Sequence, residues 1–212
     1  KFPAIALLIS GGHTELVLMD SWTNKKIIGE TVDDAVGEAF DKVARMLGLP
    51  YPGGPEISAL AEKARNSKLE ILNPKLPRPM INSGDYNFSF SGIKTSVLYR
   101  LRDTTSPLTP LLANERGKIA REFEEAVTEV LVSKSKRAIE EFNPQIFIIG
   151  GGVIANTYIR IEFEKMISDF PGLNLLIPEK SLTTDNAVMI AIAGYFADLT
   201  RSTSSGQAPL EL

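Results

Sequence analysis

Short apolar runs separated by turn residues open the chain and predict a small antiparallel sheet. Residues 4–9 are continuously apolar over the length of a strand, and residues 15–19 follow as a second run after a Gly-Gly break. This arrangement is typical of a hairpin, and residues 26–31 predict a third strand beside it.

Apolar positions then recur with the 3.6-residue period of helices, first over residues 33–47, where Gly48 ends the pattern. The same period predicts further helices at 55–65, 92–102 and 114–142. The last third alternates between strand and helix patterns, at 145–149, 155–170, 173–177 and 184–199. This alternation predicts a parallel α/β portion.

Composition narrows the function classes. The 212 residues contain no cysteine and one histidine, which excludes a disulfide scaffold, thiolate metal sites and a cysteine nucleophile. No apolar run approaches the roughly 18 residues of a membrane span, so no membrane association is expected. The net charge is −3. Nucleic-acid binding would therefore depend on a local basic patch or a partner.

Two glycine-rich junctions interrupt the side-chain rows of predicted strands. The first, Ser10-Gly11-Gly12-His13-Thr14, lies in the hairpin turn. Without Cβ atoms its backbone could approach a ligand and direct N–H groups at an anion. The alternative is a tight hairpin turn that binds nothing.

The second junction, Gly150-Gly151-Gly152, ends a strand and precedes a helix, which is a general geometry for nucleotide approach. It lacks the spacing of the dinucleotide fingerprint and the Gly-Lys-Ser/Thr of a P-loop. Asn156 follows in the first turn of the helix. Its amide could contact a base or ribose, or it could be a helix cap.

Two carboxylates remain open to two interpretations each. Asp41 could pair with Arg45 four residues on, or accept the hydroxyls of a ribose. Gly53-Gly54 is either a turn or a backbone edge against the same sugar. Asp185 could be a helix N-cap or a single metal ligand whose partner ligands lie outside this chain.

These segments occur together in one family. The chain resembles the tRNA N6-adenosine threonylcarbamoyltransferases, once described as O-sialoglycoprotein endopeptidases. The likeness covers residues 4 to about 199 and is carried by "SGGHT", "DDAVGEAFDKVARMLGLPYPGGP", "PRPM", "FSFSGIKT", "GGGVIAN" and "TTDNAVMIA".

The resemblance implies an α/β protein with the two-lobed actin/Hsp70/sugar-kinase-like (ASKHA) fold. We expect an N-terminally truncated chain with an incomplete N-terminal lobe. Residues 1–112 would be the remainder of that lobe with a helical insertion, 113–199 the C-terminal α/β lobe and 200–212 a flexible tail. The two glycine junctions would then face each other across a cleft between the lobes.

The resemblance also implies transfer of the threonylcarbamoyl group from threonylcarbamoyl-AMP to the exocyclic amine of the adenosine beside the tRNA anticodon. It assigns substrate and nucleotide contacts to Leu8, Ile9, Ser10, Gly11, Gly12, Asp41, Gly54 and Asn156, and no catalytic side chain. One divalent metal ion, iron or zinc, would be held by Asp185 with ligands outside this chain. A shorter paralogue, a small ATPase and a cytoplasmic location are further expectations.

Three alternatives compete with this interpretation. The chain could be a non-catalytic paralogue that acts as a partner subunit, although such a protein would not need Asp185 and "GGGVIAN". It could be a small-molecule kinase of the same fold, but no clear catalytic aspartate lies near the glycine hairpin. The old protease description has little support, because the sequence lacks a His-Glu-x-x-His stretch.

Overall fold

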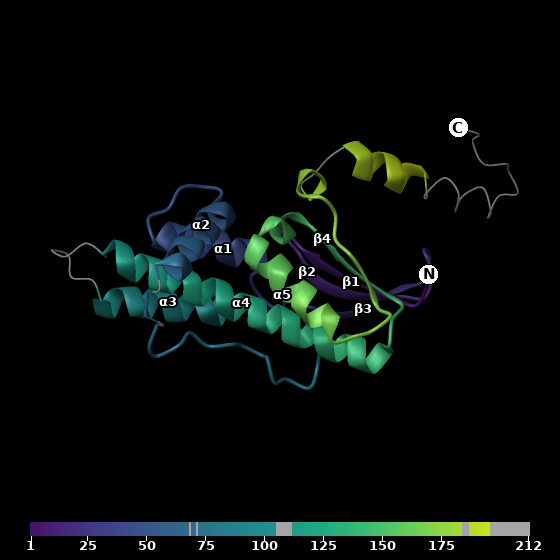
Figure 1. Ribbon diagram of the computed structural model, residues 1–212, viewed down its shortest axis with the longest axis horizontal. Helices are drawn as coiled ribbons and strands as arrows, with labels where there is room; N and C mark the ends of the chain where they lie inside the picture. The colour runs from purple at the N-terminus through teal and green to yellow at the C-terminus, as the bar shows by residue number, and fades with distance from the viewer. Residues whose placement is uncertain (68, 71, 105–111, 184–186, 196–212) are drawn as a thin grey trace, which may run out of the picture.

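A mixed five-stranded sheet forms the centre of the fold (Figure 1). The computed structural model describes residues 1–67, 69–70, 72–104, 112–183 and 187–195. Within these residues the strands lie in the order β3-β2-β1-β4-β5. They are β1 (Ala4–Ile9), β2 (Thr14–Met19), β3 (Lys25–Glu30), β4 (Ile146–Gly150) and β5 (Asn174–Leu176).

The pairing of the strands agrees with the expectations from the sequence. The first three strands are antiparallel neighbours, as the apolar runs predicted. β4 lies parallel to β1, and β5 lies parallel to β4. The alternation of strand and helix after residue 145 therefore forms a parallel half of the same sheet.

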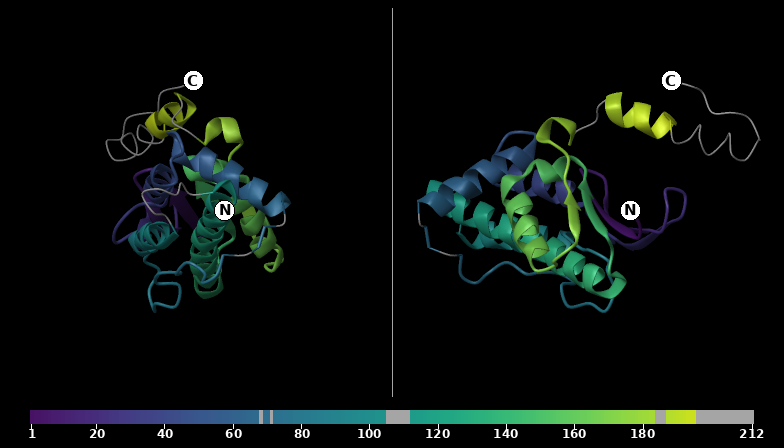
Figure 2. Two further views of the ribbon diagram at one scale, coloured as in Figure 1. Left: turned by 90° about the vertical axis from the view of Figure 1, so that its left-hand side faces the viewer. Right: turned by 45° about the vertical axis from the view of Figure 1, so that its right-hand side comes forward.

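The helices fall close to their predicted positions. They are α1 (Val36–Met46), α2 (Gly53–Asn66), α3 (Ser91–Thr104), α4 (Ala113–Phe142) and α5 (Thr157–Ser168), with short 3₁₀ turns η1 (Gly152–Ala155) and η2 (Lys180–Leu182). Residues 187–195 form a helix of exposed residues, drawn away from the sheet in Figure 2. They are the described part of the helix expected at 184–199.

The start of α1 differs from the expectation that Asp33 and Asp34 form its first turn. The helix begins at Val36, whose N–H donates to the buried Thr14 hydroxyl at 2.9 Å. Asp33 instead accepts hydrogen bonds at the N-terminus of α3, from the backbone N–H groups of Phe90 and Ser91 among others. Asp34 forms ion pairs with Lys42 of α1 and Lys94 of α3. Both carboxylates thus contact residues of α3, far away in the sequence. The local sequence does not reveal such contacts.

Asp33 carries a shifted pKa as a result. Burial raises the pKa of its carboxyl group, but hydrogen bonds from the Ser89 and Ser91 hydroxyls and from two backbone N–H groups outweigh that effect. The pKa is therefore lower than 3.8. The charged carboxylate stabilises the N-terminal end of α3.

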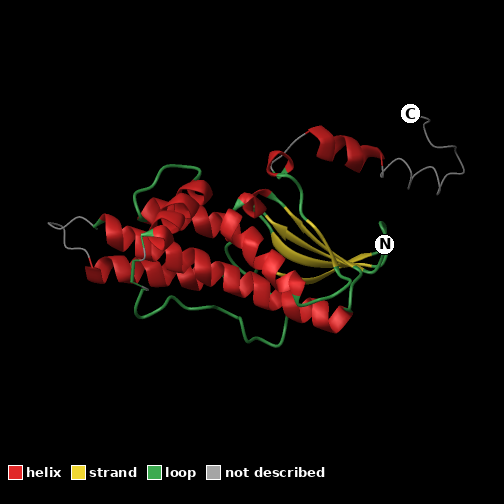
Figure 3. Cartoon of the chain, viewed as in Figure 1, coloured by secondary structure: helices red, strands yellow, loops and turns green. Residues whose placement is uncertain are grey.

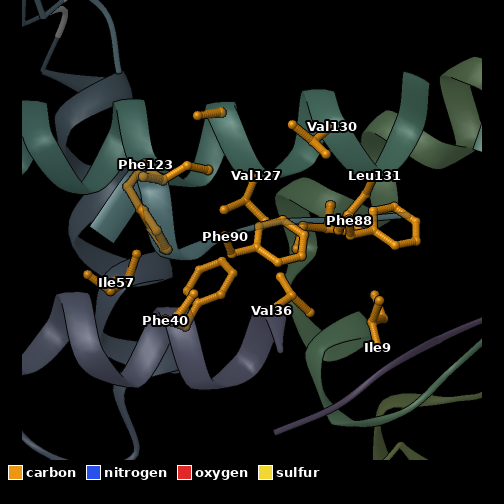
Figure 4. Close-up of a cluster of buried hydrophobic side chains, with 14 of the residues drawn as sticks. Ile9, Val36, Phe40, Ile57, Phe88, Phe90, Phe123, Val127, Val130 and Leu131 are labelled. Carbon is orange, nitrogen blue, oxygen red and sulfur yellow. The ribbon is translucent and has the colours of Figure 1, made fainter. Parts of the chain in front are cut away.

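The core lies between the sheet and the helices. Ile9 from β1, Val36 and Phe40 from α1, and Phe123 and Val127 from α4 belong to one buried cluster (Figure 4). Phe40 and Phe123 meet edge to face, with ring centroids 5.0 Å apart. The long helix α4 packs on α2 and also contacts β1 (Figure 3). It therefore connects the helices between β3 and β4 with the sheet.

The two faces of the sheet are unequal. Ile5, Leu7 and Ile9 of β1 point toward the helices, as the alternation of a strand requires. The other face carries a smaller cluster of strand residues, in which Ala4, Ala6, Val17 and Met19 are buried. No helix in the described parts of the chain is long and apolar enough to cross a membrane.

The expected opposition of the two glycine junctions is wrong. β1 and β4 are adjacent parallel strands, with Leu8 opposite Gly150. Their carboxyl ends therefore lie side by side at one edge of the sheet, because parallel strands end on the same side. The domain boundary expected at residue 112 lies directly before α4, and α4 packs with the other helices on one sheet. The division of 1–112 and 113–199 between lobes of a larger protein stays a prediction.

Candidate functional site

A pocket of about 410 Å³ opens at the carboxyl ends of β1 and β4. Its walls come from the glycine turn after β1, from α1, from the start of α2, and from η1 with the first residue of α5. Ligands commonly bind at this edge of α/β sheets. Four of the predicted contact residues line it, namely Gly11, Asp41, Gly54 and Asn156.

The glycine turn is held by its own serine. The Ser10 backbone N–H donates to the His13 carbonyl at 2.9 Å, and the Ser10 Oγ accepts from the N–H groups of Gly12 and His13 at 3.3 and 3.0 Å. The Gly37 N–H of α1 donates to the Ser10 carbonyl at 3.1 Å. A Cβ on Gly37 would lie 2.6 Å from that oxygen, so the turn and α1 approach as closely as backbone allows.

The five predicted residues of this loop differ in what they offer a ligand. A Cβ on Gly11 or Gly12 would meet no atom within 4 Å, so space is open beside both. Ile9 is buried in the core. Leu8, on the opposite face of the strand, is 40% exposed. Among these five, Gly11 is the one that lines the pocket. Ile9 could contribute only through its backbone, whereas the Leu8 side chain is accessible.

The second glycine junction has two functions. Gly151 has a φ of +100°, and a Cβ there would lie 2.3 Å from the Ile9 carbonyl oxygen. This glycine therefore permits β4 to end against β1. The sequence analysis expected the whole junction to open space for a ligand, and Gly151 does not do so. Gly152, one residue on, lines the pocket.

Asp41 makes a contact that the sequence analysis did not consider. Its Oδ1 accepts the backbone N–H of Gly53 at 2.8 Å, which secures the first residue of α2. No Asp41–Arg45 ion pair is present among the described residues. A Cβ on Gly53 would lie 2.5 Å from the Ala44 Cβ, whereas a Cβ on Gly54 would meet nothing within 4 Å. Gly53 lets the helices approach, and Gly54 borders the pocket.

Asn156 is a helix cap that also lines the pocket. Its Oδ1 accepts the Ile159 N–H at 3.0 Å at the start of α5, and its Nδ2 donates to Glu124 at 2.6 Å. Glu124 lies on α4 with a fully buried side chain and pairs with Arg65 of α2 at 2.5 Å. Burial raises the pKa of Glu124, against the opposing hydrogen bonds from Arg65 and Asn156.

Sequence reasoning missed Glu124 and Arg65. One signal was available, because the helical period places Glu124 on the same stripe as Ala120, Val127 and Leu131, which are buried. A carboxylate on an apolar stripe needs a partner. The sequence did not show which cation supplies it, since Arg65 lies 59 positions away.

The pocket combines helix N-termini with two acidic side chains, Asp41 and Glu62. Gly37 is the second residue of α1, Gly54 the second of α2 and Thr157 the first of α5, so three helix N-termini border one space. Helix N-termini favour negative charge. The Asp41 carboxylate can accept hydroxyl hydrogens, and Phe40 belongs to the apolar part of the wall. This combination suits a nucleotide.

The described residues do not fit a metal centre. They contain no group of three or more His, Cys, Asp or Glu side chains that could hold an ion. Asp185, the predicted ligand, lies outside the described residues. The one histidine, His13, is exposed in the glycine turn. The expectation that the other metal ligands lie outside this chain stays a prediction.

Comparison with known proteins agrees with the motifs. The family model of the tRNA N6-adenosine threonylcarbamoyltransferases matches residues 1–192. The enzyme of that name from Bacillus licheniformis is 47% identical over 197 residues, which cover 93% of this chain and 55% of the relative. Those of Bacillus subtilis and Thermosipho africanus are each 45% identical, over 92% of this chain and 54% and 56% of theirs.

A crystal structure of T. kodakarensis HypF aligns with a TM-score of 0.48 at 15% identity, covering 76% of this chain and 18% of that one. The chain spans about 55% of the length of the curated relatives it matches. The family model covers most of the chain, and the identities are high over nearly all of it. The chain therefore belongs to the family of tRNA N6-adenosine threonylcarbamoyltransferases.

Proposed function

We propose that the pocket holds the AMP moiety of threonylcarbamoyl-AMP, and that the complete protein transfers the threonylcarbamoyl group to tRNA. The observation that carries the proposal is the meeting of Gly11, Asp41, Gly54 and Asn156 around one cavity. These positions lie up to 145 residues apart in sequence and come from separate elements, yet each was assigned to nucleotide contact by the family resemblance. Their meeting around one pocket, as four of the eight assigned residues, supports the proposal.

In the proposed reaction, the exocyclic amine of an adenosine next to the anticodon attacks the threonylcarbamoyl carbonyl carbon. A C–N bond forms, the bond from that carbon to the phosphate oxygen breaks, AMP leaves and the amine loses a proton. The described residues bind and orient the leaving nucleotide. Backbone of the Leu8 to Gly12 segment and of Gly54 approaches the adenylate, and Asp41 accepts ribose hydroxyls.

Four finer features belong to the same proposal. The complete protein has the actin/Hsp70/sugar-kinase-like fold, which the mixed sheet with a pocket at the ends of its parallel strands supports. It holds one divalent metal ion, iron or zinc, through Asp185 and ligands from outside this chain. It works with a shorter paralogue and a small ATPase. It acts in the cytoplasm, where tRNA is modified.

The direct test is ligand binding followed by turnover. Calorimetry on the complete protein should show one AMP bound per chain, with GMP and CMP markedly weaker. With partner subunits, threonylcarbamoyl-AMP and a tRNA that has adenosine beside the anticodon, mass spectrometry of the nucleosides should show threonylcarbamoyladenosine. Absence of both AMP binding and product would contradict the proposal.

The same experiment separates the alternatives. A non-catalytic paralogue would bind tRNA or a partner subunit without forming the modified nucleoside. A small-molecule kinase would convert ATP to ADP in the presence of a sugar or similar acceptor, with no need for tRNA. Either result, with no threonylcarbamoyladenosine formed, would replace the proposed activity.

A further inference from the structure

A buried carboxylate behind the pocket joins two of its walls. Glu124 lies on α4, and its side chain has no exposed surface. It does not line the pocket, but Asn156 of one wall does and hydrogen-bonds to it. Ser58 of another wall lies close enough to lower the pKa of the Glu124 carboxyl. The third partner is Arg65, at 2.5 Å on the opposite oxygen.

The carboxylate fixes which way the Asn156 amide points. A carboxylate only accepts hydrogen bonds, so the amide nitrogen must face Glu124, at 2.6 Å from its Oε1. The amide oxygen then faces the Ile159 N–H, which it accepts at 3.0 Å. One N–H of the amide remains for a ligand. A rotated amide would place its oxygen against the carboxylate and lose the helix cap as well.

The same group fixes the distance between α2 and α5. Arg65 of α2 donates to Glu124 and lies over the Tyr158 ring of α5, with 4.2 Å from its guanidinium carbon to the ring centroid. Ser58, on the pocket side of α2, contacts the same carboxylate. Glu124 therefore holds two of the three helices whose N-terminal residues border the pocket, α2 and α5.

Stability alone does not account for an ionisable side chain at this place. Burial penalises the charge, and a well-packed apolar residue often replaces a buried ion pair without loss. We infer that Glu124 is a positioning residue: it sets the orientation of Asn156 and the spacing of the α2 and α5 walls for the adenosine moiety, without touching the ligand. This inference rests on the proposed function, because it concerns the same pocket.

The chain supplies a matched control on the same helix. Glu122 is also buried, with 2% of its side chain exposed, and it also pairs with an arginine, Arg78. Its other partner is the Leu76 N–H at 3.1 Å, in the segment between α2 and α3. Neither Glu122 nor its partners line the pocket. Its removal should disturb folding comparably to that of Glu124 and leave the pocket intact.

The experiment uses the complete protein with Glu124→Leu, Glu124→Gln, Glu122→Leu and Glu122→Gln. Calorimetry with AMP should show affinity at least tenfold weaker for Glu124→Leu. Glu124→Gln keeps one acceptor for the Asn156 amide and should lose about threefold. Both Glu122 variants should bind within twofold of the wild type, although thermal unfolding should show that Glu122→Leu loses stability.

A second measurement needs no ligand. The Asn156 side-chain amide proton that faces a charged carboxylate should resonate downfield in the NMR spectrum and exchange slowly with solvent. Glu124→Gln, with a neutral acceptor, should move it upfield, and Glu122→Gln should leave it unchanged. This comparison decides the orientation of Asn156 if Glu124→Leu does not fold.

Four outcomes would count against these ideas in different ways. Wild-type affinity in both Glu124 variants would overturn the positioning role, as would equal losses from Glu122→Leu and Glu124→Leu. An Asn156 amide signal that ignores Glu124→Gln would overturn it too. A wild-type protein that binds no AMP would instead overturn the proposed function, and the amide signal would still decide whether Glu124 orients Asn156.

Discussion

Adjacent glycines at the start of α2 should respond in opposite ways to the same substitution. In Gly53→Ala the new methyl group would lie 2.5 Å from the Ala44 Cβ and 2.8 Å from the Asp41 Cα. In Gly54→Ala it would meet no protein atom within 4 Å and would project beside the pocket. One variant tests packing between helices, and the other tests the pocket.

The sizes of the two effects follow from these distances. Overpacking costs roughly 1–3 kcal/mol in the free energy of unfolding. Alanine in place of glycine in a helix returns about 0.5–1 kcal/mol. Gly53→Ala should therefore lose about 1–2 kcal/mol, which lowers Tm by roughly 2–8 °C for a chain of this size. Gly54→Ala carries no clash, so its Tm should stay the same or rise slightly.

Ligand affinity should follow the reverse order. The Gly54→Ala methyl group occupies space that the adenylate is proposed to fill, so AMP affinity should fall at least tenfold, or about 1.4 kcal/mol. Calorimetry and thermal unfolding on the same samples measure both quantities. Gly84→Ala, where a Cβ also meets nothing within 4 Å but the residue does not line this pocket, should change neither. Wild-type AMP affinity in Gly54→Ala would refute the assignment of this edge.

Other predictions concern single carboxylates and the metal. Asp41→Ala should weaken AMP binding at least tenfold by calorimetry, and unchanged affinity would reject its contact with the ribose. Asp33→Asn removes the negative charge at the N-terminus of α3 and should lose about 0.3–1 kcal/mol of unfolding free energy at pH 7. Because the folded pKa of Asp33 is below 3.8, its contribution to stability is present above that value and is lost as pH falls through the folded pKa. The free energies of unfolding of the wild type and Asp33→Asn should therefore converge in acid. A constant difference between them would contradict this. Elemental analysis of the 212-residue chain alone should find well below one iron or zinc per chain, and a tightly bound stoichiometric ion would contradict the expectation.

The elements that could be predicted from the sequence are those set by local pattern. The run at residues 4–9 coincides with β1, and the long apolar period at 114–142 differs from α4 by one residue. Both rest on burial of one face, which leaves a periodic trace in the sequence. Boundaries failed where a side chain from elsewhere decides them, as the Thr14 hydroxyl does at the start of α1.

The arrangement of the site was predictable only as a set of positions. The family resemblance gave Gly11, Asp41, Gly54 and Asn156, and the structure brings these four to one pocket. Sequence alone did not show that β1 and β4 are neighbours, since strand pairing depends on contacts more than 130 residues apart. For the same reason it could not reveal that Gly151 serves the close approach of these two strands.

The shape of the pocket depends on how closely the backbone segments around it pack at glycines. At Gly37, Gly53 and Gly151 a Cβ would lie between 2.3 and 2.6 Å from a neighbouring atom, so turn, helices and strands meet backbone to backbone there. Walls in such contact cannot move inward, and a close-packed interior resists small shifts. At Gly11 and Gly54 the same construction meets open space. If a ligand binds here as proposed, it meets walls that are already in backbone contact, and its affinity should depend on fit at the open glycines.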